Sequence, residues 1–189
     1  MLKSLFRKRP SQSQGDPLYA AVAAQARQPA FYTDLGVADR IDARFELYTL
    51  HALLLILRLR DEDKVASGAD GSGEGASGPG VEAAQSLFDS YVSALDNVLR
   101  ELGVGDVSMA KKMRTLGEAL YGRMTAYETP LRAGDAATLS AGLARNVLES
   151  EDAERGAALA RYALTAREGL KTQSIADILK HPSWPEIAA

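Results

Sequence analysis

A single stretch, from Asp42 to Arg60, is apolar around most of the circumference of a helix. Its large apolar residues are Phe45, Leu47, Tyr48, Leu50, Leu53, Leu54, Leu55, Ile56, Leu57 and Leu59. A helix of this kind has to be surrounded by other elements. The uncharged run covers only residues 47–57 and is closed by Arg58, well short of the roughly 18 residues that a membrane span needs. We therefore predict a buried central helix in an all-α domain.

Amphipathic segments that can cover this helix follow one another along the chain. We expect helices over residues 16–28, 81–102, 109–127, 136–148 and 153–170, and a short helical turn over residues 175–179. Pro29 is expected to end the first helix, and residues 30–37 to form a connector or single turn. The chain contains neither an alternating strand pattern nor an internal repeat. The prediction is a single-domain irregular bundle of about six or seven helices over residues 16–180, followed by a C-terminal tail at residues 181–189.

Two of the expected helices, at residues 81–102 and 109–127, are separated by a short connection. In the first, the side chains expected to face the core are Leu87, Phe88, Tyr91, Leu95, Val98, Leu99 and Leu102. In the second they are Met109, Met113, Leu116, Leu120, Met124 and Tyr127. Gly103 is expected to cap the first helix, Ser108 the second, and a turn is expected at Pro130. Because the connection is short, we expect the two helices to lie against each other.

Residues 67–80 differ in composition from the rest of the chain. They contain six glycines, one proline and no large apolar side chain, so they cannot offset the entropy lost on ordering. We predict a flexible surface loop within the domain. Residues 73–78 match the pattern GxGxxG, but no strand precedes them, and a dinucleotide site is not expected.

The first 15 residues are predicted to form a flexible basic tail, without the apolar core that a signal peptide requires. Its candidates for contact with an anionic membrane surface are Lys3, Phe6, Arg7, Lys8 and Arg9. A purely solvated tail and a cleavable mitochondrial presequence are the alternatives. The whole chain has a formal net charge of -3, so contact with nucleic acid would require a local basic patch.

Residue types on which many catalytic sites depend are scarce. The absence of cysteine excludes disulfides, zinc ribbons, thiol nucleophiles and haem attachment through CxxCH. Of the two histidines, His51 lies among leucines and is interpreted as a core histidine in preference to a metal or haem ligand; His181 is distant in sequence. Residues 108–111 match the SxxK acylase signature without its companion motifs, and a capping serine explains them. We predict no catalytic residue, cofactor or metal site, and infer protein binding by elimination.

Several blocks of the sequence resemble the ubiquinol-cytochrome c chaperone family. They are FYTDLGV at residues 31–37, RFELYTLH at 44–51, FD at 88–89, LRELGVGDVS at 99–108, KK at 111–112 and ALYGR at 119–123. Their order and spacing agree with the family from about residue 18 to residue 169, although the glycine-rich insertion is longer than the family needs. The block from residue 99 to residue 123 is the most specific.

The resemblance implies a non-enzymatic chaperone that promotes assembly of the cytochrome bc1 complex of the respiratory chain, ubiquinol-cytochrome c reductase. Mitochondrial members bind newly synthesised cytochrome b near the ribosomal exit tunnel and work with a small partner protein. Cytochrome b is therefore the expected client, and the ribosome and an anionic membrane are further expected contacts. The lack of a long N-terminal extension favours a bacterial cytoplasmic protein, peripheral to the inner membrane, over one on the matrix side of a mitochondrial membrane.

We expect the partner surface within the most specific block. Its candidate residues are Gly103, Gly105, Asp106, Lys111, Lys112, Arg114, Tyr121 and Arg123. As alternatives, Gly103, Gly105 and Gly122 could serve a helix cap and close helix contact, and the basic residues could form a solvated face. The competing function is a ribosome- or nucleic-acid-associated helical module without a cytochrome client.

Overall fold

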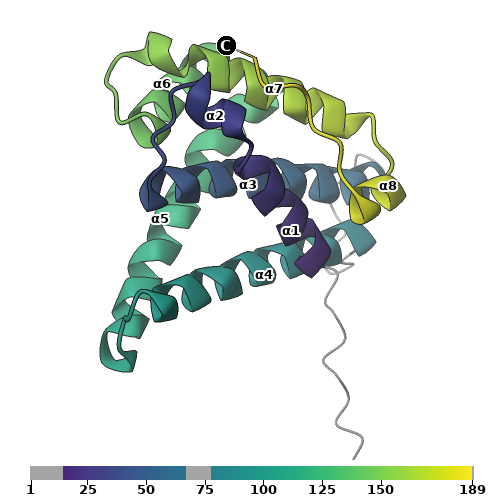
Figure 1. The fold of residues 1–189 in the computed structure, drawn as a ribbon. Helices are drawn as coiled ribbons and strands as arrows, with labels where there is room; N and C mark the ends of the chain where they lie inside the picture. Colours follow the sequence, from purple (N-terminus) through teal and green to yellow (C-terminus); the bar gives the residue numbers. More distant parts are fainter. Residues whose placement is uncertain (1–14, 67–77, 189) are drawn as a thin grey trace, which may run out of the picture.

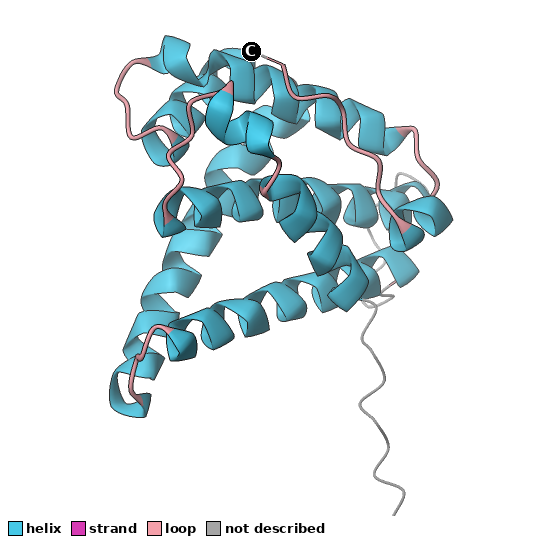
Figure 2. Cartoon of the chain, in the orientation of Figure 1, coloured by secondary structure: helices cyan, strands magenta, loops and turns pink. Residues whose placement is uncertain are grey.

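The computed structural model describes residues 15–66 and 78–188, and within these ranges the chain forms helices and loops without strands (Figures 1 and 2). The helices are α1 (Gly15–Ala26), α2 (Pro29–Thr33), α3 (Ile41–Ala66), α4 (Pro79–Glu101), α5 (Asp106–Ala133), α6 (Ala136–Val147), the 3-10 helix η1 (Ala153–Gly156), α7 (Ala157–Lys171) and α8 (Ile175–Lys180). The predicted all-α fold is therefore confirmed. The predictions for residues 1–14 and 67–77 lie outside the described residues.

Helix α3 is the buried centre of the bundle, as predicted. Every residue from Thr49 to Leu59 is buried, because α1, α4, α5, α6 and α7 all contact this helix. Figure 1 shows α3 between α7 on one side and α4 on the other. Each fully buried leucine in it contributes on the order of 2 kcal/mol through removal from water. This burial holds the shorter helices around a single core.

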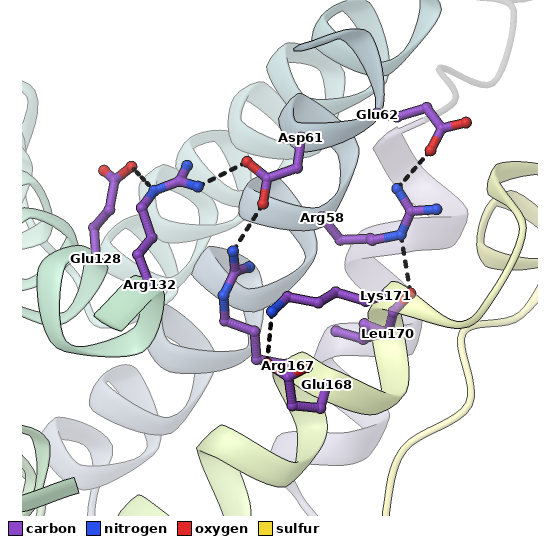
Figure 3. Close-up of polar contacts among 9 residues, drawn as sticks. All are labelled: Arg58, Asp61, Glu62, Glu128, Arg132, Arg167, Glu168, Leu170 and Lys171. Atoms are coloured by element: carbon purple, nitrogen blue, oxygen red, sulfur yellow. Dashed lines mark hydrogen bonds and ion pairs between the residues drawn. The ribbon is translucent and has the colours of Figure 1, made fainter. Parts of the chain in front are cut away.

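Charged side chains join the end of α3 to its neighbours (Figure 3). Arg58 donates hydrogen bonds to the carbonyls of Leu170 and Gln173, each at 2.9 Å, and so satisfies acceptors at the end of α7. Asp61 accepts from Arg132 of α5 and Arg167 of α7, each at 2.7 Å. Partial burial alone would raise the pKa of Asp61, but these two hydrogen bonds lower it overall. The carboxylate therefore ties together α3, α5 and α7.

Several predicted helix boundaries were wrong. The single turn expected within residues 30–37 is present as the short helix α2, but it begins one residue earlier, at Pro29, which occupies an early helical position where its missing N–H is harmless. Helix α4 begins at Pro79, two residues before the predicted start. Helix α5 continues through Pro130 to Ala133. A proline inside a helix costs about 3 kcal/mol, but Tyr127, Pro130 and Leu131 are all buried, and their packing offsets that cost.

Local contacts also fix the start of α6 and the C-terminal tail. Asp135 caps α6 by accepting a hydrogen bond from the backbone N–H of Thr138 at 3.0 Å. The tail after α8 is not helical, and the ring of Trp184 lies edge-on to His51, with centroids 5.1 Å apart. Within the described ranges, none of the helices combines the length and the hydropathy that crossing a bilayer requires.

Candidate partner-binding hairpin

Helices α4 and α5 form a hairpin whose turn projects away from the rest of the bundle (Figure 1). The two helices diverge from this turn, so the prediction that they lie against each other was wrong. The reason is that α4 packs mainly on α1 and α3, whereas α5 packs mainly on α3 and α6. We call residues 92–122, which include the turn and the adjoining halves of both helices, the arm.

The turn at the tip of the arm is fixed by backbone hydrogen bonds. Gly103 has a φ of 78°, a conformation that glycine adopts without strain. The N–H of Val104 donates to the carbonyl of Leu99 at 3.0 Å, and the N–H of Gly103 donates to the carbonyl of Arg100 at 2.9 Å. These two hydrogen bonds make a Schellman motif. The predicted glycine cap is confirmed. Ser108 instead lies inside α5 and donates its hydroxyl to the carbonyl of Gly105 at 3.0 Å.

The core-facing stripe of α4 continues into the arm and loses its cover there. Leu87 and Tyr91 are fully buried, whereas Val98 is 42% exposed and Leu102 57% exposed. These residues recur at the helical spacing that places them on one face, and Ala94 lies between them on the same face. We call Ala94, Val98 and Leu102 the α4 stripe. The prediction that Val98 and Leu102 face the core was wrong.

The half of α5 that belongs to the arm is also partly uncovered. Met113 and Leu116 are half-buried, on the same face as the buried Met109 and Leu120. Tyr121 is 75% exposed. Of the four large apolar side chains exposed among the described residues, three lie on the arm, and the fourth is Ile41. The arm is therefore where this chain presents apolar surface.

The structure divides the predicted basic residues between two faces of α5. Lys111, Arg114 and Tyr121 are exposed and share one face by their helical spacing. Lys112 is exposed on a different flank, one that it shares with Arg123. The predicted residues therefore lie on one helix without forming one continuous patch.

Arg123 has a structural contact that the sequence did not reveal. Its Nε donates to both carboxylate oxygens of Glu46 on α3, at 3.0 and 3.1 Å. Glu46 is buried, and this burial raises its pKa although Arg123 opposes the rise. The ion pair fixes the flank of α5 that carries Arg123 and Lys112 toward α3.

The glycines of the arm have different roles. Gly103 is required by its positive φ, as described above. A Cβ added at Gly105 or Gly122 would meet no atom within 4 Å, so neither glycine permits a close helix contact. Asp106 is the first residue of α5. The alternative prediction of a close helix contact at Gly122 was therefore wrong, because the structure has open space there.

His51 is a core residue whose ring nitrogens are both hydrogen bonded. Nδ1 lies 2.7 Å from the carbonyl of Leu47, which can only accept, so Nδ1 donates. Burial lowers the pKa of His51 to about 4, so the ring is neutral and Nε2 accepts from the Tyr162 hydroxyl at 2.8 Å. Tyr162 in turn accepts from Gln25 at 3.0 Å. The interpretation of His51 as a core histidine is therefore confirmed. Its hydrogen bonds join α1 and α7 to α3.

The fold and the arm together define an all-α bundle that exposes an apolar surface away from its core. The sequence profile of the ubiquinol-cytochrome c chaperone family matches residues 33–184. The chain belongs to this family, which confirms the resemblance seen in the sequence. The matched range contains the whole arm.

A solved structure supports the same assignment. The chain is similar to the crystal structure of the Cbp3 homolog from Brucella abortus, with 30% sequence identity and a TM-score of 0.75. The similarity covers 92% of this chain and 90% of the other. No curated protein matches the chain significantly.

Proposed function

We propose that this protein is a non-enzymatic assembly chaperone that binds newly synthesised cytochrome b and promotes assembly of the ubiquinol-cytochrome c reductase (bc1) complex. Membership of the ubiquinol-cytochrome c chaperone family supports this class of function. The structural observation that carries the proposal is the α4 stripe, in which Val98 and Leu102 leave the core and become exposed. A chaperone for a client with apolar transmembrane helices needs such a surface.

The chemistry of the arm fits an apolar client. Val98 and Leu102 offer aliphatic surface, and Met113 adds a flexible, polarizable side chain that adapts to different partners. Lys112 places a positive charge on the flank beside this surface, and the exposed Lys111 and Arg114 carry positive charge on another face of α5. Acidic groups of a client would be attracted to it, which would speed encounter and orient the client.

The partner surface that we propose includes the residues expected from the sequence. The turn with Gly103, Gly105 and Asp106 positions it, and Lys111, Lys112, Arg114 and Tyr121 supply its side chains. Arg123 acts through its ion pair with Glu46, which orients α5. The ribosome near its exit tunnel and an anionic membrane surface are further proposed contacts. A cytoplasmic location at the bacterial inner membrane, or on the matrix side in mitochondria, accords with them.

The proposal is tested by removing the protein from its native cells and measuring assembled bc1 complex on native gels. We expect loss of the assembled complex while cytochrome b messenger RNA stays at its normal level. Reintroducing the wild-type chain should restore the complex, and the double variant Lys111→Glu, Lys112→Glu should restore it only in part. Normal assembly without the protein would refute the proposal.

The exposed cations of α5 favour a second candidate function, a module that binds the ribosome or another nucleic acid without a cytochrome client. Lys111, Lys112 and Arg114 lie within four residues and are all exposed. Against this candidate, Glu101 and Glu118 are also exposed on the arm, and the chain is acidic overall. Retention on ribosomes that falls steeply with salt and is independent of cytochrome b would support it.

A further inference from the structure

We propose that the α4 stripe seats one apolar helix of the client, and that Lys112 holds an acidic residue at one end of that helix. This inference rests on the proposed function and adds to it the place and the kind of segment bound. The occupant is a single helix with an apolar face and a terminal carboxylate. We call Ala94, Val98, Leu102 and Lys112 the seat.

The direction in which the α4 stripe faces follows from its buried half. The hydroxyl of Tyr91 lies 2.8 Å from the Thr49 hydroxyl of α3, so this face of α4 is turned toward α3. Val98 and Leu102 continue the same face by their helical spacing. On α5, the contact between Arg123 and Glu46 shows which flank is turned toward α3, and Lys112 lies on that flank. The α4 stripe and Lys112 therefore face the same side of the hairpin.

The spacing of the stripe selects a helix as the occupant. Ala94, Val98 and Leu102 are four residues apart and form one ridge, the surface feature that packs into the groove of another helix. The small side chain of Ala94, between the larger Tyr91 and Val98, allows a second backbone to approach closely. The ridge extends over about 12 Å, enough for two turns of a partner helix. Addition of a strand would require a sheet edge, and the described residues contain no sheet.

Charge sets the direction of the bound helix. Lys112 lies on the arm near its tip and is exposed, so the seat carries a positive charge at this end. A helix with an acidic residue at the end that lies near the tip is complementary to this charge.

Site-specific photocrosslinking tests the seat in the full-length protein in its native cells. A benzophenone amino acid is placed at Val98 or Leu102, and at Ile41, which is 59% exposed and lies outside the arm. We expect adducts from Val98 and Leu102 that map to one apolar helix of cytochrome b, and none from Ile41. Adducts with a loop of cytochrome b, a ribosomal protein, a second copy or residues 1–14 of the same chain would overturn the inference.

Substitutions provide an independent test with matched controls. Capture of cytochrome b by the tagged protein should fall at least tenfold in the double variant Val98→Asp, Leu102→Asp, and should stay unchanged in Ile41→Asp. Lys112→Glu should also lower capture, whereas Lys180→Glu, an exposed lysine at the end of α8 and outside the arm, should not. Circular dichroism checks that each variant is folded. Normal capture of cytochrome b by the Val98→Asp, Leu102→Asp variant would overturn the proposed seat and leave the proposed function intact. Failure of the wild-type chain to capture cytochrome b would overturn both proposals.

Discussion

At the scale of single residues, His51 shows how one polar group is accommodated in the buried central helix α3. Its neutral ring donates to Leu47 and accepts from Tyr162, which accepts from Gln25. A protonated ring would turn Nε2 into a donor and leave the Tyr162 hydroxyl proton without its acceptor. The folded protein therefore disfavours the charged form, in agreement with the lowered pKa.

This predicts a contribution of His51 to acid sensitivity. The pKa of His51 falls from 6.5 to about 4 on folding, so below about pH 6.5 the unfolded chain binds a proton that the folded chain does not. The free energy of unfolding should therefore drop as the pH falls from about 6.5 to about 4, by about 3 kcal/mol from this residue. Urea unfolding over this range should show a smaller drop for His51→Gln than for the wild type. Equal drops would contradict the prediction.

Two glycines provide a test of helix packing with opposite expected outcomes. A Cβ at Gly156 would lie 2.1 Å from the backbone oxygen of Ser140, whereas one at Gly122 would meet nothing within 4 Å. Gly156→Ala should lower the free energy of unfolding by about 1–3 kcal/mol or more, because backbone has to shift. Gly122→Ala should be neutral or raise it by up to about 1 kcal/mol through helix propensity. Thermal unfolding measures both; a stable Gly156→Ala variant would show that α6 and η1 are not this close.

The sequence predicted some of these residue roles and not others. It identified His51 as a core residue from its leucine neighbours, but its partner Tyr162 is 111 residues away, and no local pattern indicates such a pair. It marked Gly103 as a cap because a glycine followed the apolar stripe. It gave Gly15 and Gly156 no role, since close approach between helices depends on their tertiary arrangement.

At the scale of elements, α4 is the helix whose surroundings change most along its length. Its apolar pattern is regular throughout, which is why all of it was expected to face the core. Periodicity defines an apolar face but does not show whether another element covers it. The cover of this face decreases along α4: Tyr91 is fully buried, Val92 and Leu95 are partly buried against the core, and Val98 and Leu102 on the arm are exposed.

The change in cover predicts a difference between two identical substitutions on α4. Leu87 is fully buried and Leu102 is 57% exposed. Leu87→Ala should lower the free energy of unfolding by about 2–5 kcal/mol, because it leaves a cavity in the core. Leu102→Ala should change it by less than about 1 kcal/mol. Chemical denaturation of the two variants gives the comparison, and similar losses would mean that the arm is packed against the body in solution.

At the scale of the whole molecule, the fold class and family could be predicted from the sequence, and the shape of the candidate site could not. The central helix was predictable because Thr49 to Leu59 requires cover on all sides. The family followed from the blocks between residues 31 and 123. The divergence of α4 from α5 depends on which helices each one packs against, and these contacts join residues far apart in the sequence.

The arm also explains how one bundle can combine stability with binding. The core around α3 is fully enclosed, so apolar surface can be exposed on the arm without opening that core. Helical segments with few buried contacts are the ones that open or move most easily. An apolar client helix would replace the missing cover of the α4 stripe.

The most direct test of the account is crosslinking affinity capture of the tagged full-length protein from its native cells, with mass spectrometry of what is recovered. We expect cytochrome b among the captured proteins, in an amount that falls in the double variant Lys111→Glu, Lys112→Glu while the fold is retained. Recovery of ribosomal proteins or RNA without cytochrome b would contradict the proposed client and favour the ribosome-binding function.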